Sequence, residues 1–452
     1  MRAGNRTVAL ALAALLLAAC ASAPAPVRPT PPPTVTPVAP APASPTPAPA
    51  PPTPTAAPAS ATPAATLTAA APRYDLVLLG GTLIDGTGAP PLPGAVVAIL
   101  GGWVAAVGPA DEVPFAAGTP TRDLRGATIL PGFVNAHAHT WELETDALRG
   151  WTRAGITTVR DVGGPLVPLV ARREALAAGE QALPRLLVSG PIVTVPGGHP
   201  IPIYGHNERA LAVRGPEDAA ARTAALLDGG ADLIKIAVSG RTDTGWPELS
   251  DEEIRAIVET AHGRGARVTA HVDRAAALHR AVEQGIDDAA HMPRDRMPDE
   301  LVALMVARGV ALVPTIAVYE ELARARGDAP GWRQAVLPVM QDNLRRFAAA
   351  GGTLALGDDY GNPGVPLGMP MAEIRHWIAA GLTPMQVLVA ATKGGAAVCG
   401  LAGAIGVLRP GVAADILVVA GDPLADIEVL GRPMLVLHGG QVAYSSALQR
   451  RG

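Results

Sequence analysis

"NAHAHT" (residues 135–140) is the stretch that decides how this 452-residue chain is interpreted. It follows an apolar run, residues 127–134, which only a proline and a glycine interrupt. If the segment is a strand, His137 and His139 stand two positions apart and their side chains point to the same side. Two imidazoles on one side of a strand end can share a metal ion, so the rest of the chain has to supply further ligands.

Short β-like runs alternate with amphipathic stretches beyond residue 124, which is the rhythm of repeated βα units and a parallel sheet. The runs expected to be strands are "TILPGFVNAHAH" (128–139), "ITTVRDVG" (156–163), "RLLVSGPIV" (185–193), "DLIKIAVSG" (232–240), "RVTAHV" (267–272), "DDAAHM" (287–292), "VALVPTI" (310–316) and "TLALGDD" (353–359). The amphipathic stretches include residues 216–227, 251–262 and 333–349. Eight such strands predict an α/β fold, a (β/α)₈ TIM barrel whose active site lies at the C-terminal ends of its strands.

Ligand-type side chains fall at these predicted strand ends. They are His137 and His139 on the first strand, Lys235 on the fourth, His271 on the fifth, His291 on the sixth and Asp359 on the eighth. Lys235 is the most informative, because its neighbours in "LIKIAV" are apolar and burial in a parallel strand would depress the pKa of its amine. A neutral amine can take up carbon dioxide to form a carbamate that bridges two metal ions. The structural alternative is a lysine that reaches a carboxylate.

This ordered set resembles the metal ligands of the amidohydrolase superfamily. The flanks agree, since "LVLLGGTLIDGTG" and "LAGAIGVLRPGVAADILVVAGDPLADI" resemble the two parts of its small β domain. Within the superfamily, "ADLIKIAVSG" and "VTVPGGHP" resemble the imidazolonepropionase-like branch, which includes metal-dependent dipeptidases of the prolidase type. The resemblance covers nearly all of residues 74–445, and it implies a small β-sandwich, built from the N- and C-terminal segments, beside the barrel.

The resemblance implies two divalent metal ions, most simply Zn²⁺. Their ligands would be His137, His139 and Asp359 on one ion, His271 and His291 on the other, and a carbamylated (N6-carboxylated) Lys235 as the bridge. Asp358 stays an alternative to Asp359, although the Gly-x-Asp spacing of the family favours Asp359. A hydroxide bridging the ions would attack the scissile carbonyl, and Asp359 would pass its proton to the leaving nitrogen.

Substrate contacts are expected from the loops that follow the strands. "PGGH" ends the third predicted strand and puts His199 near the barrel mouth, with Tyr204 soon after. Either side chain could hydrogen-bond the substrate carbonyl or the tetrahedral oxyanion, and plain loop packing is the alternative. Arg160, Arg241 and Arg294 lie at or just after strand ends, where one of them could grip a substrate carboxylate through its planar fork.

The predicted function is hydrolysis of amide C–N bonds in small substrates, namely dipeptides or N-acyl amino acids. A cyclic-amide hydrolase or an aminohydrolase of the same superfamily is the alternative. Arg274 stands three residues after His271, where mononuclear deaminases carry a glutamate, and this disfavours a deaminase. A non-catalytic binding lipoprotein on the same scaffold is a further alternative, but such a protein would be expected to have lost some ligands.

The composition and the N-terminal sequence bear on partners and location. A net charge of −4 and a pI near 6.2 give no basic patch, so nucleic acid is not an expected partner. Residues 7–19 form an apolar run behind two arginines, and the run ends in "LAAC" (17–20). This resembles a bacterial lipoprotein signal peptide with Cys20 as the lipidated residue, and an ordinary secretory signal is the alternative. The expected location is the cell envelope, lipid-anchored at the periplasmic face or in the outer membrane.

The expected organisation has five parts. They are a signal peptide (1–19), a Pro/Ala-rich disordered tether (20–72), the N-terminal part of the small β domain (73–130), the barrel (131–403) and the C-terminal part of the small β domain (404–446). The tether is almost wholly Pro, Ala, Thr and Ser, which cannot bury enough apolar surface to fold. Cys399 has no partner left for an internal disulfide once Cys20 is lipidated, so the folded part relies on its core. A homo-oligomer is compatible with this pattern.

Overall fold

The computed structural model of the chain describes residues 71–179, 183–205, 207–240 and 245–446. The expected signal peptide and all but the last two residues of the expected tether lie outside these ranges. The described residues belong to one compact unit, residues 68–452. Within them, no helix combines the length and the apolar character that crossing a lipid bilayer requires.

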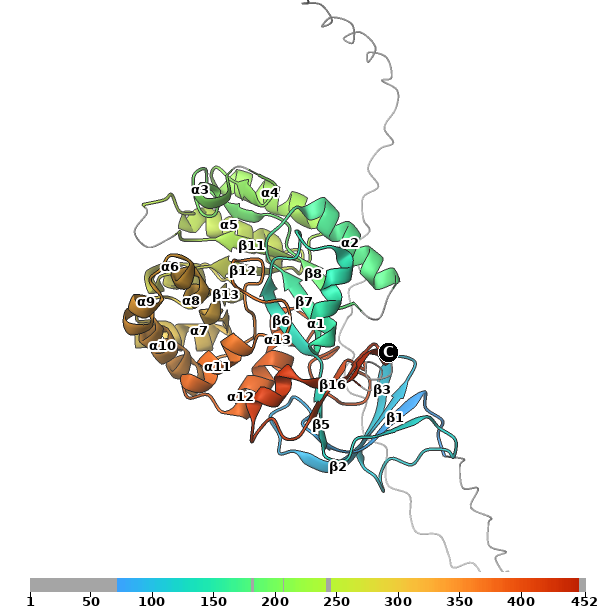
Figure 1. Cartoon of the computed structure of the whole chain (residues 1–452). Coiled ribbons are helices and arrows are strands. Elements are labelled where there is room, and N and C mark those ends of the chain that lie inside the picture. Colours follow the sequence, from blue (N-terminus) through green and yellow to red (C-terminus); the bar gives the residue numbers. More distant parts are fainter. Residues whose placement is uncertain (1–70, 180–182, 206, 241–244, 447–452) are drawn as a thin grey trace, which may run out of the picture. The chain divides into compact units, whose positions relative to one another are not determined.

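One sheet is built from both ends of the compact unit (Figure 1). Its strands are β1 (Leu76–Leu83), β2 (Leu92–Leu100), β3 (Trp103–Pro109), β4 (Thr121–Asp123), β5 (Ala127–Pro131), β15 (Ile416–Ala420), β16 (Pro433–His438) and β17 (Gln441–Ser445). Their order is β17-β16-β15-β5-β1-β2-β3, with β4 paired to β1. Val418 of β15 faces Ile129 of β5 in antiparallel register, and both belong to a buried apolar cluster with Val97 and Ile99. Apolar burial between distant segments thus holds the two chain ends together.

The first predicted strand, residues 128–139, is two strands in different sheets. β5 ends at Pro131, and β6 (Phe133–Ala138) pairs in parallel with β7 (Ile156–Asp161). Gly132 stands between them and donates its backbone N–H to the carbonyl of Asp415 at 2.8 Å. A Cβ at residue 132 would lie 2.3 Å from Oγ1 of Thr157. Only glycine therefore lets the chain pass from one sheet into the next at this point.

The parallel strands form two ladders. One has the order β6-β7-β8, and the other has the order β10-β9-β11-β12-β13-β14. The further strands are β8 (Arg185–Val188), β9 (Ile192–Thr194), β10 (Ala210–Ala212), β11 (Leu233–Ala237), β12 (Arg267–His271), β13 (Asp288–Ala290) and β14 (Ala311–Val313). The third predicted strand is thus split, because β8 pairs with β7 whereas β9 pairs with β11.

The eighth predicted strand, residues 353–359, forms one isolated bridge, between Leu354 and Leu312, instead of a ladder. On one side it bonds to Leu312, which donates to the Thr353 carbonyl at 2.9 Å. On the other side Ala136 of β6 donates to the Leu356 carbonyl at 2.7 Å. The segment therefore lies between β14 and β6, and the whole is a mixed α/β fold consistent with a TIM-barrel-like domain.

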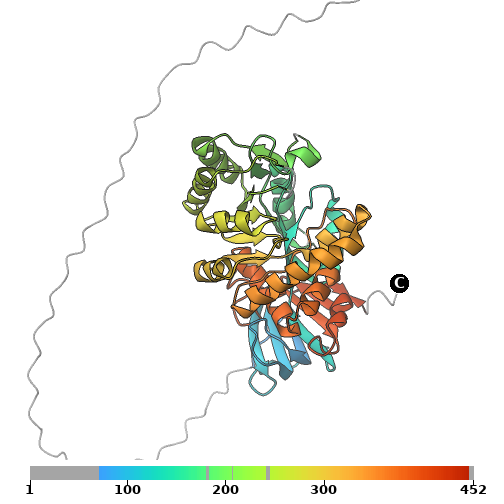
Figure 2. The same ribbon diagram turned by 90° about the vertical axis from the view of Figure 1, so that its left-hand side faces the viewer.

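Helices surround the parallel strands in both views (Figures 1 and 2). They are α1 (Arg149–Arg153), α2 (Leu166–Ala178), α3 (Ile201–Tyr204), α4 (Pro216–Asp228), α5 (Asp251–His262), α6 (Ala275–Glu283), α7 (Asp299–Arg308), α8 (Ile316–Ala325), α9 (Ala329–Ala335), α10 (Leu337–Ala349), α11 (Met371–Ala379), α12 (Pro384–Val389) and α13 (Gly395–Val398).

Two helices illustrate how the sequence sets their ends. The predicted start of α5 is confirmed, since Ser250 and Glu253 form a reciprocal capping box. The predicted helix 333–349 is instead broken at Val336 into α9 and α10. Pro338, near the start of α10, has no backbone N–H to continue the preceding helix, which explains the break.

Candidate metal centre

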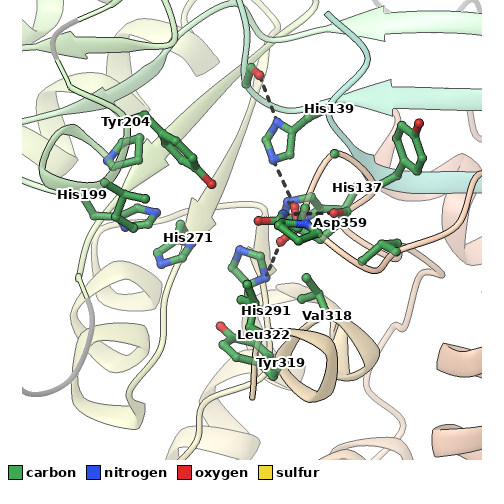
Figure 3. Close-up of a pocket in the computed structure, with 18 of the residues that line it drawn as sticks. His137, His139, His199, Tyr204, His271, His291, Val318, Tyr319, Leu322 and Asp359 are labelled. Atoms are coloured by element: carbon green, nitrogen blue, oxygen red, sulfur yellow. Dashed lines mark hydrogen bonds and ion pairs between the residues drawn. The ribbon is translucent and has the colours of Figure 1, made fainter. Parts of the chain in front are cut away.

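A cavity of about 500 Å³ opens at the C-terminal ends of the parallel strands and brings together the predicted metal ligands and two of the predicted substrate residues, His199 and Tyr204 (Figure 3). Its lining includes the six candidate ligands and both candidate substrate residues, namely His137, His139, Lys235, His271, His291, Asp359, His199 and Tyr204. The volume suits a small-molecule substrate.

Asp359 lies at the centre of the histidines (Figure 3). Its Oδ1 is 3.2 Å from Nε2 of His137 and 3.1 Å from Nε2 of His139. Its Oδ2 is 4.0 Å from Nδ1 of His291. Ligand atoms of His137, His291 and Asp359 all lie within 4.8 Å of one another, which is a spacing suited to metal binding.

Several buried polar atoms at this centre lie close together without forming hydrogen bonds of good geometry. Both ring nitrogens of His137 are buried without a hydrogen bond to any described residue, and so is Oδ1 of Asp359. An unsatisfied buried polar group costs about 1–3 kcal/mol, so a cluster of them is stable only if something else binds there. Neutral imidazoles around a carboxylate are a donor set that fits a divalent transition metal ion.

The protonation states also suit metal binding. Burial lowers the pKa of His137 to about 3, and the positive charge of Lys235 acts in the same direction. Burial likewise holds the pKa values of His271 and His291 well below the usual value. For Asp359, burial alone would raise the pKa, but the adjacent histidines outweigh it and hold the pKa well below its usual range. At neutral pH His137, His271 and His291 therefore offer neutral rings with free lone pairs, and Asp359 offers an ionised carboxylate. At His139 burial alone would lower the pKa, but the adjacent Asp359 outweighs it and raises the pKa of that ring.

Lys235 is buried in β11, with only 1% of its surface exposed, between the fully buried Ile234 and Ile236. Burial lowers the pKa of its amine to about 7, although the charge of Asp359 opposes this shift. The depressed pKa predicted from the sequence is thus reproduced. A large fraction of the amine is neutral near pH 7 and can act as a nucleophile.

Neighbouring groups orient the histidine rings. Nδ1 of His139 lies 3.0 Å from the carbonyl oxygen of Gly163, so a hydrogen bond there leaves Nε2 facing Asp359. A Cβ at Gly163 would lie 2.9 Å from Cε1 of this ring, which explains the glycine. Nδ1 of His291 is held 2.7 Å from Oγ1 of Thr315.

The backbone at the centre is strained. His291, Thr315 and Asp359 have φ angles of 80°, 47° and 59°, which non-glycine residues rarely adopt. Such conformations cost on the order of 1–3 kcal/mol each and are concentrated at functional sites. Neither this strain nor the contact between Thr315 and His291 could be predicted from the sequence.

His199 and Tyr204 both face the cavity (Figure 3). The ring of His199 stacks on that of His271 at 4.1 Å, and its Nδ1 is buried without a partner among the described residues. Burial lowers the pKa of His199 to about 4, so the ring is neutral and carries one N–H donor. Burial also raises the pKa of Tyr204, so its hydroxyl, which points into the cavity, stays protonated.

The three arginines proposed to grip a carboxylate occupy different positions. Arg160 is fully buried and does not line the cavity. Its Nη2 lies 2.8 Å from Oδ1 of Asp288, so it forms an ion pair in the protein interior. Arg294 lines the cavity but is paired with the buried Asp273 at 2.7 Å. Arg241 lies outside the described residues.

Several cavity residues were missed by the sequence analysis. Trp141 and Glu142 follow the "NAHAHT" segment directly, and Arg209 follows the third predicted strand. Tyr319, in the first turns of α8, lies with its ring 5.8 Å from that of His291. A tryptophan placed two residues after a ligand histidine was the one available signal, since the chain has only six tryptophans.

The sequence of this chain is similar to those of known hydrolases. Residues 128–442 match the model of the amidohydrolase family. An ochratoxinase of Aspergillus niger is 27% identical over 414 residues, which cover 80% of this chain and 84% of the relative. An imidazolonepropionase of Symbiobacterium thermophilum is 28% identical over 405 residues, which cover 76% of this chain and 91% of the relative.

Two solved structures are similar over most of the chain. A putative prolidase from Bifidobacterium longum has a TM-score of 0.73 at 28% identity and covers 81% of this chain and 94% of its own. A Xaa-Pro dipeptidase, with methionine bound in its active site, has a TM-score of 0.72 at 25% identity. It covers 82% of this chain and 100% of its own.

Proposed function

Since this chain belongs to the amidohydrolase family, we propose that it is a metal-dependent hydrolase that cleaves the C–N bonds of dipeptides or N-acyl amino acids. The observation that carries the proposal is the convergence of His137, His291 and Asp359, whose ligand atoms lie within 4.8 Å of one another in the cavity. The similar prolidase and Xaa-Pro dipeptidase structures support a peptide-like amide as the substrate.

The proposed cofactors are two divalent ions, most simply Zn²⁺. The ligand groups proposed are His137, His139 and Asp359 for one ion, His271 and His291 for the other, with N6-carboxylated Lys235 as the bridge. The support for the carbamate is the burial of Lys235 and the lowered pKa of its amine. Bound there, such ions would supply a nucleophilic water at neutral pH and polarise the substrate carbonyl.

Asp359 is the group proposed to move the proton. Its carboxylate is ionised and lies among the ligand histidines, with Oδ1 within 3.2 Å of the Nε2 atoms of His137 and His139. It would accept the proton of the attacking water and deliver it to the leaving nitrogen. His199 and Tyr204 would donate hydrogen bonds to the carbonyl oxygen as negative charge develops there.

Closure of the barrel is a further part of the proposal. The segment of residues 353–359 is proposed to close a (β/α)₈ barrel, which its hydrogen bonds to both Leu312 and Ala136 support. The barrel would span residues 131–403, with the small β domain on either side of it in the sequence.

A lipid anchor at Cys20, with residues 20–72 as the spacer, would hold the enzyme in the cell envelope. Replacing Cys20 by alanine should then release the protein from membranes.

The first test is the metal content of the purified protein, prepared without chelator and with bicarbonate present. Elemental analysis should find about two divalent ions per chain if the bridged centre is right. The same preparation should hydrolyse members of a library of dipeptides and N-acyl amino acids. Hydrolysis of cyclic amides alone would favour the cyclic-amide alternative. Failure to bind any divalent metal would refute the proposal and favour a binding protein.

A further inference from the structure

Arg209 lies at the cavity mouth in an unusual setting. Its guanidinium carbon is 3.8 Å from the ring centroid of Trp141 and 5.1 Å from that of Tyr204. Nη2 of Arg209 also donates a 2.6 Å hydrogen bond to Oε1 of Glu142. All four residues line the cavity of the candidate metal centre. We infer that Arg209 is the carboxylate-binding residue of this site, which restricts substrates to amides that carry a nearby free carboxylate. The inference rests on the proposed amide hydrolysis.

The aromatic rings hold the guanidinium ready for a ligand. A cation over the face of tryptophan or tyrosine is attracted by the ring, and stacking fixes the plane of the arginine fork. The Arg209 side chain is only 23% exposed, so its conformational freedom is restricted. A fork fixed in advance loses less entropy when it binds a planar carboxylate.

Part of the fork has no acceptor in the protein. Nε of Arg209 is buried and makes no hydrogen bond to any described residue. A buried N–H without an acceptor is costly, and a carboxylate bound in two-pronged fashion would remove that cost. Arg209 therefore has both the charge and the unused donor that a carboxylate receptor needs.

Glu142 already shows that a carboxylate fits against this guanidinium. Its side chain is 63% exposed, so the pair with Arg209 lies at the surface and can separate at little cost. Arg294, the other cavity arginine with a known acidic partner, is bound at 2.7 Å to Asp273, whose side chain is only 4% exposed. Of these two arginines, Arg209 is the one whose partner a substrate can replace.

Arg209 contacts two residues that connect it to the candidate metal centre. Trp141 follows the ligand His139 by two residues, and Tyr204 directs its hydroxyl into the cavity (Figure 3). A substrate carboxylate on Arg209 at the mouth would thus leave the rest of the molecule to extend past Tyr204 towards the histidines. Dipeptides and N-acyl amino acids both carry a carboxylate close to the amide bond. Arg209 would recognise this shared group in either class.

The test compares matched substrates that differ only in this group. The panel contains dipeptides, N-acyl amino acids, and the same molecules with the carboxylate changed to a carboxamide. The wild-type enzyme should prefer each carboxylate, and Arg209→Met should reduce that preference in kcat/KM by about tenfold or more, mainly through KM. Arg209→Lys, which keeps the charge without the fork, should fall between the two. Comparing the dipeptides with the N-acyl amino acids in the panel shows which of these two substrate classes the enzyme hydrolyses.

Glu142→Gln is the matched control, because it removes the negative charge that competes with a substrate carboxylate and keeps the shape of the side chain. It should weaken the interaction that occupies the guanidinium and strengthen the preference for carboxylates. If Arg209 and Glu142 instead form only a structural clamp, both variants should weaken hydrolysis of both substrate types in parallel, and the inference is then overturned.

Equilibrium titration keeps the inference testable if no panel member is hydrolysed. N-acetylleucine and N-acetylleucinamide are titrated into the metal-loaded wild-type protein, Arg209→Met and Glu142→Gln, with heat as the readout. The inference requires that Arg209→Met weakens binding of N-acetylleucine by about tenfold or more relative to N-acetylleucinamide. Absence of turnover together with this result refutes the proposed hydrolysis alone. Equal binding of the two molecules by wild type and by Arg209→Met refutes the assignment of Arg209.

Discussion

Asn135 donates a hydrogen bond of 2.8 Å from its side-chain amide to Oδ1 of Asp358, which lies 223 residues away in the chain. The amide oxygen of Asn135 accepts the backbone N–H of His137 at 3.2 Å. The two segments that carry His137 and Asp359 are therefore tied together by the residues next to the ligands. This link turns the Asp358 carboxylate away from the candidate metal centre and leaves the centre to Asp359.

The neighbouring aspartates should differ sharply when each is replaced by asparagine. Asp359→Asn should lower kcat by about 10²- to 10⁴-fold, because it removes the proposed general base and a ligand. Burial raises the pKa of Asp358 to about 7, so that residue is already partly protonated at neutral pH. A neutral amide mimics this state, and Asp358→Asn should cost far less. Steady-state kinetics and metal analysis of both variants measure this difference. A larger loss of kcat in Asp358→Asn than in Asp359→Asn would make Asp358 the proton carrier.

Lys235→Ala should lower the bound metal and abolish most of the turnover, because the proposed bridge is lost. Adding a short carboxylic acid such as propionate should restore part of the activity by standing in for the carbamate. Lys393→Ala is the matched control, since Lys393 is the only other lysine of the chain and is exposed. Two metal ions and full turnover in Lys235→Ala would show that the bridging assignment is wrong.

The buried ion pair between Arg160 and Asp288 should be a large contributor to folding. Both side chains are fully buried, and Asp288 also accepts a hydrogen bond of 2.6 Å from Thr269. Asp288→Asn should reduce the free energy of unfolding by about 3–5 kcal/mol, since it leaves Arg160 charged and unpaired inside the protein.

The control for this substitution is Asp218→Asn at a partly exposed helix pair. Asp218 lies 2.8 Å from Arg222, and such pairs contribute at most about 1 kcal/mol. Urea denaturation of both variants measures the difference. Similar losses in the two variants would mean that burial of the pair with Arg160 does not set its contribution.

The same pair predicts a direction for acid unfolding. Burial alone would raise the pKa of Asp288, but the charge and hydrogen bonds of Arg160 outweigh burial and hold the pKa below its usual value. The stability from this pair is then fully present above the unfolded-state pKa of about 3.9, and it is lost as the pH falls through the folded-state pKa. In urea titrations of metal-free protein, the gap between wild type and Asp288→Asn should shrink below about pH 4. A gap independent of pH would contradict the lowered pKa.

Much of the candidate site could be predicted from residue types and their order. A histidine pair at one strand end, a lysine inside an apolar strand and an aspartate after a later strand need only the side-chain period of a strand and the shared edge of parallel strands. Those rules are local, so the sequence sufficed to collect His137, Lys235 and Asp359 in one cavity.

The details that depend on distant partners could not be read in this way. The split of residues 128–139 follows from the contact between Gly132 and Thr157, and the burial of Arg160 follows from its meeting with Asp288. The contacts of Arg209 with the rings of Trp141 and Tyr204 likewise join separate loops.

By itself, the sequence determined which ligand-type side chains this protein carries and in what order they follow the strands, because residue type and strand order can be identified from single residues and short repeats. Only the tertiary structure decided which of two adjacent aspartates lines the cavity and which arginines reach it. The physical reason is that side-chain direction depends on strained backbone angles and on hydrogen bonds to partners far along the chain, as between Asn135 and Asp358.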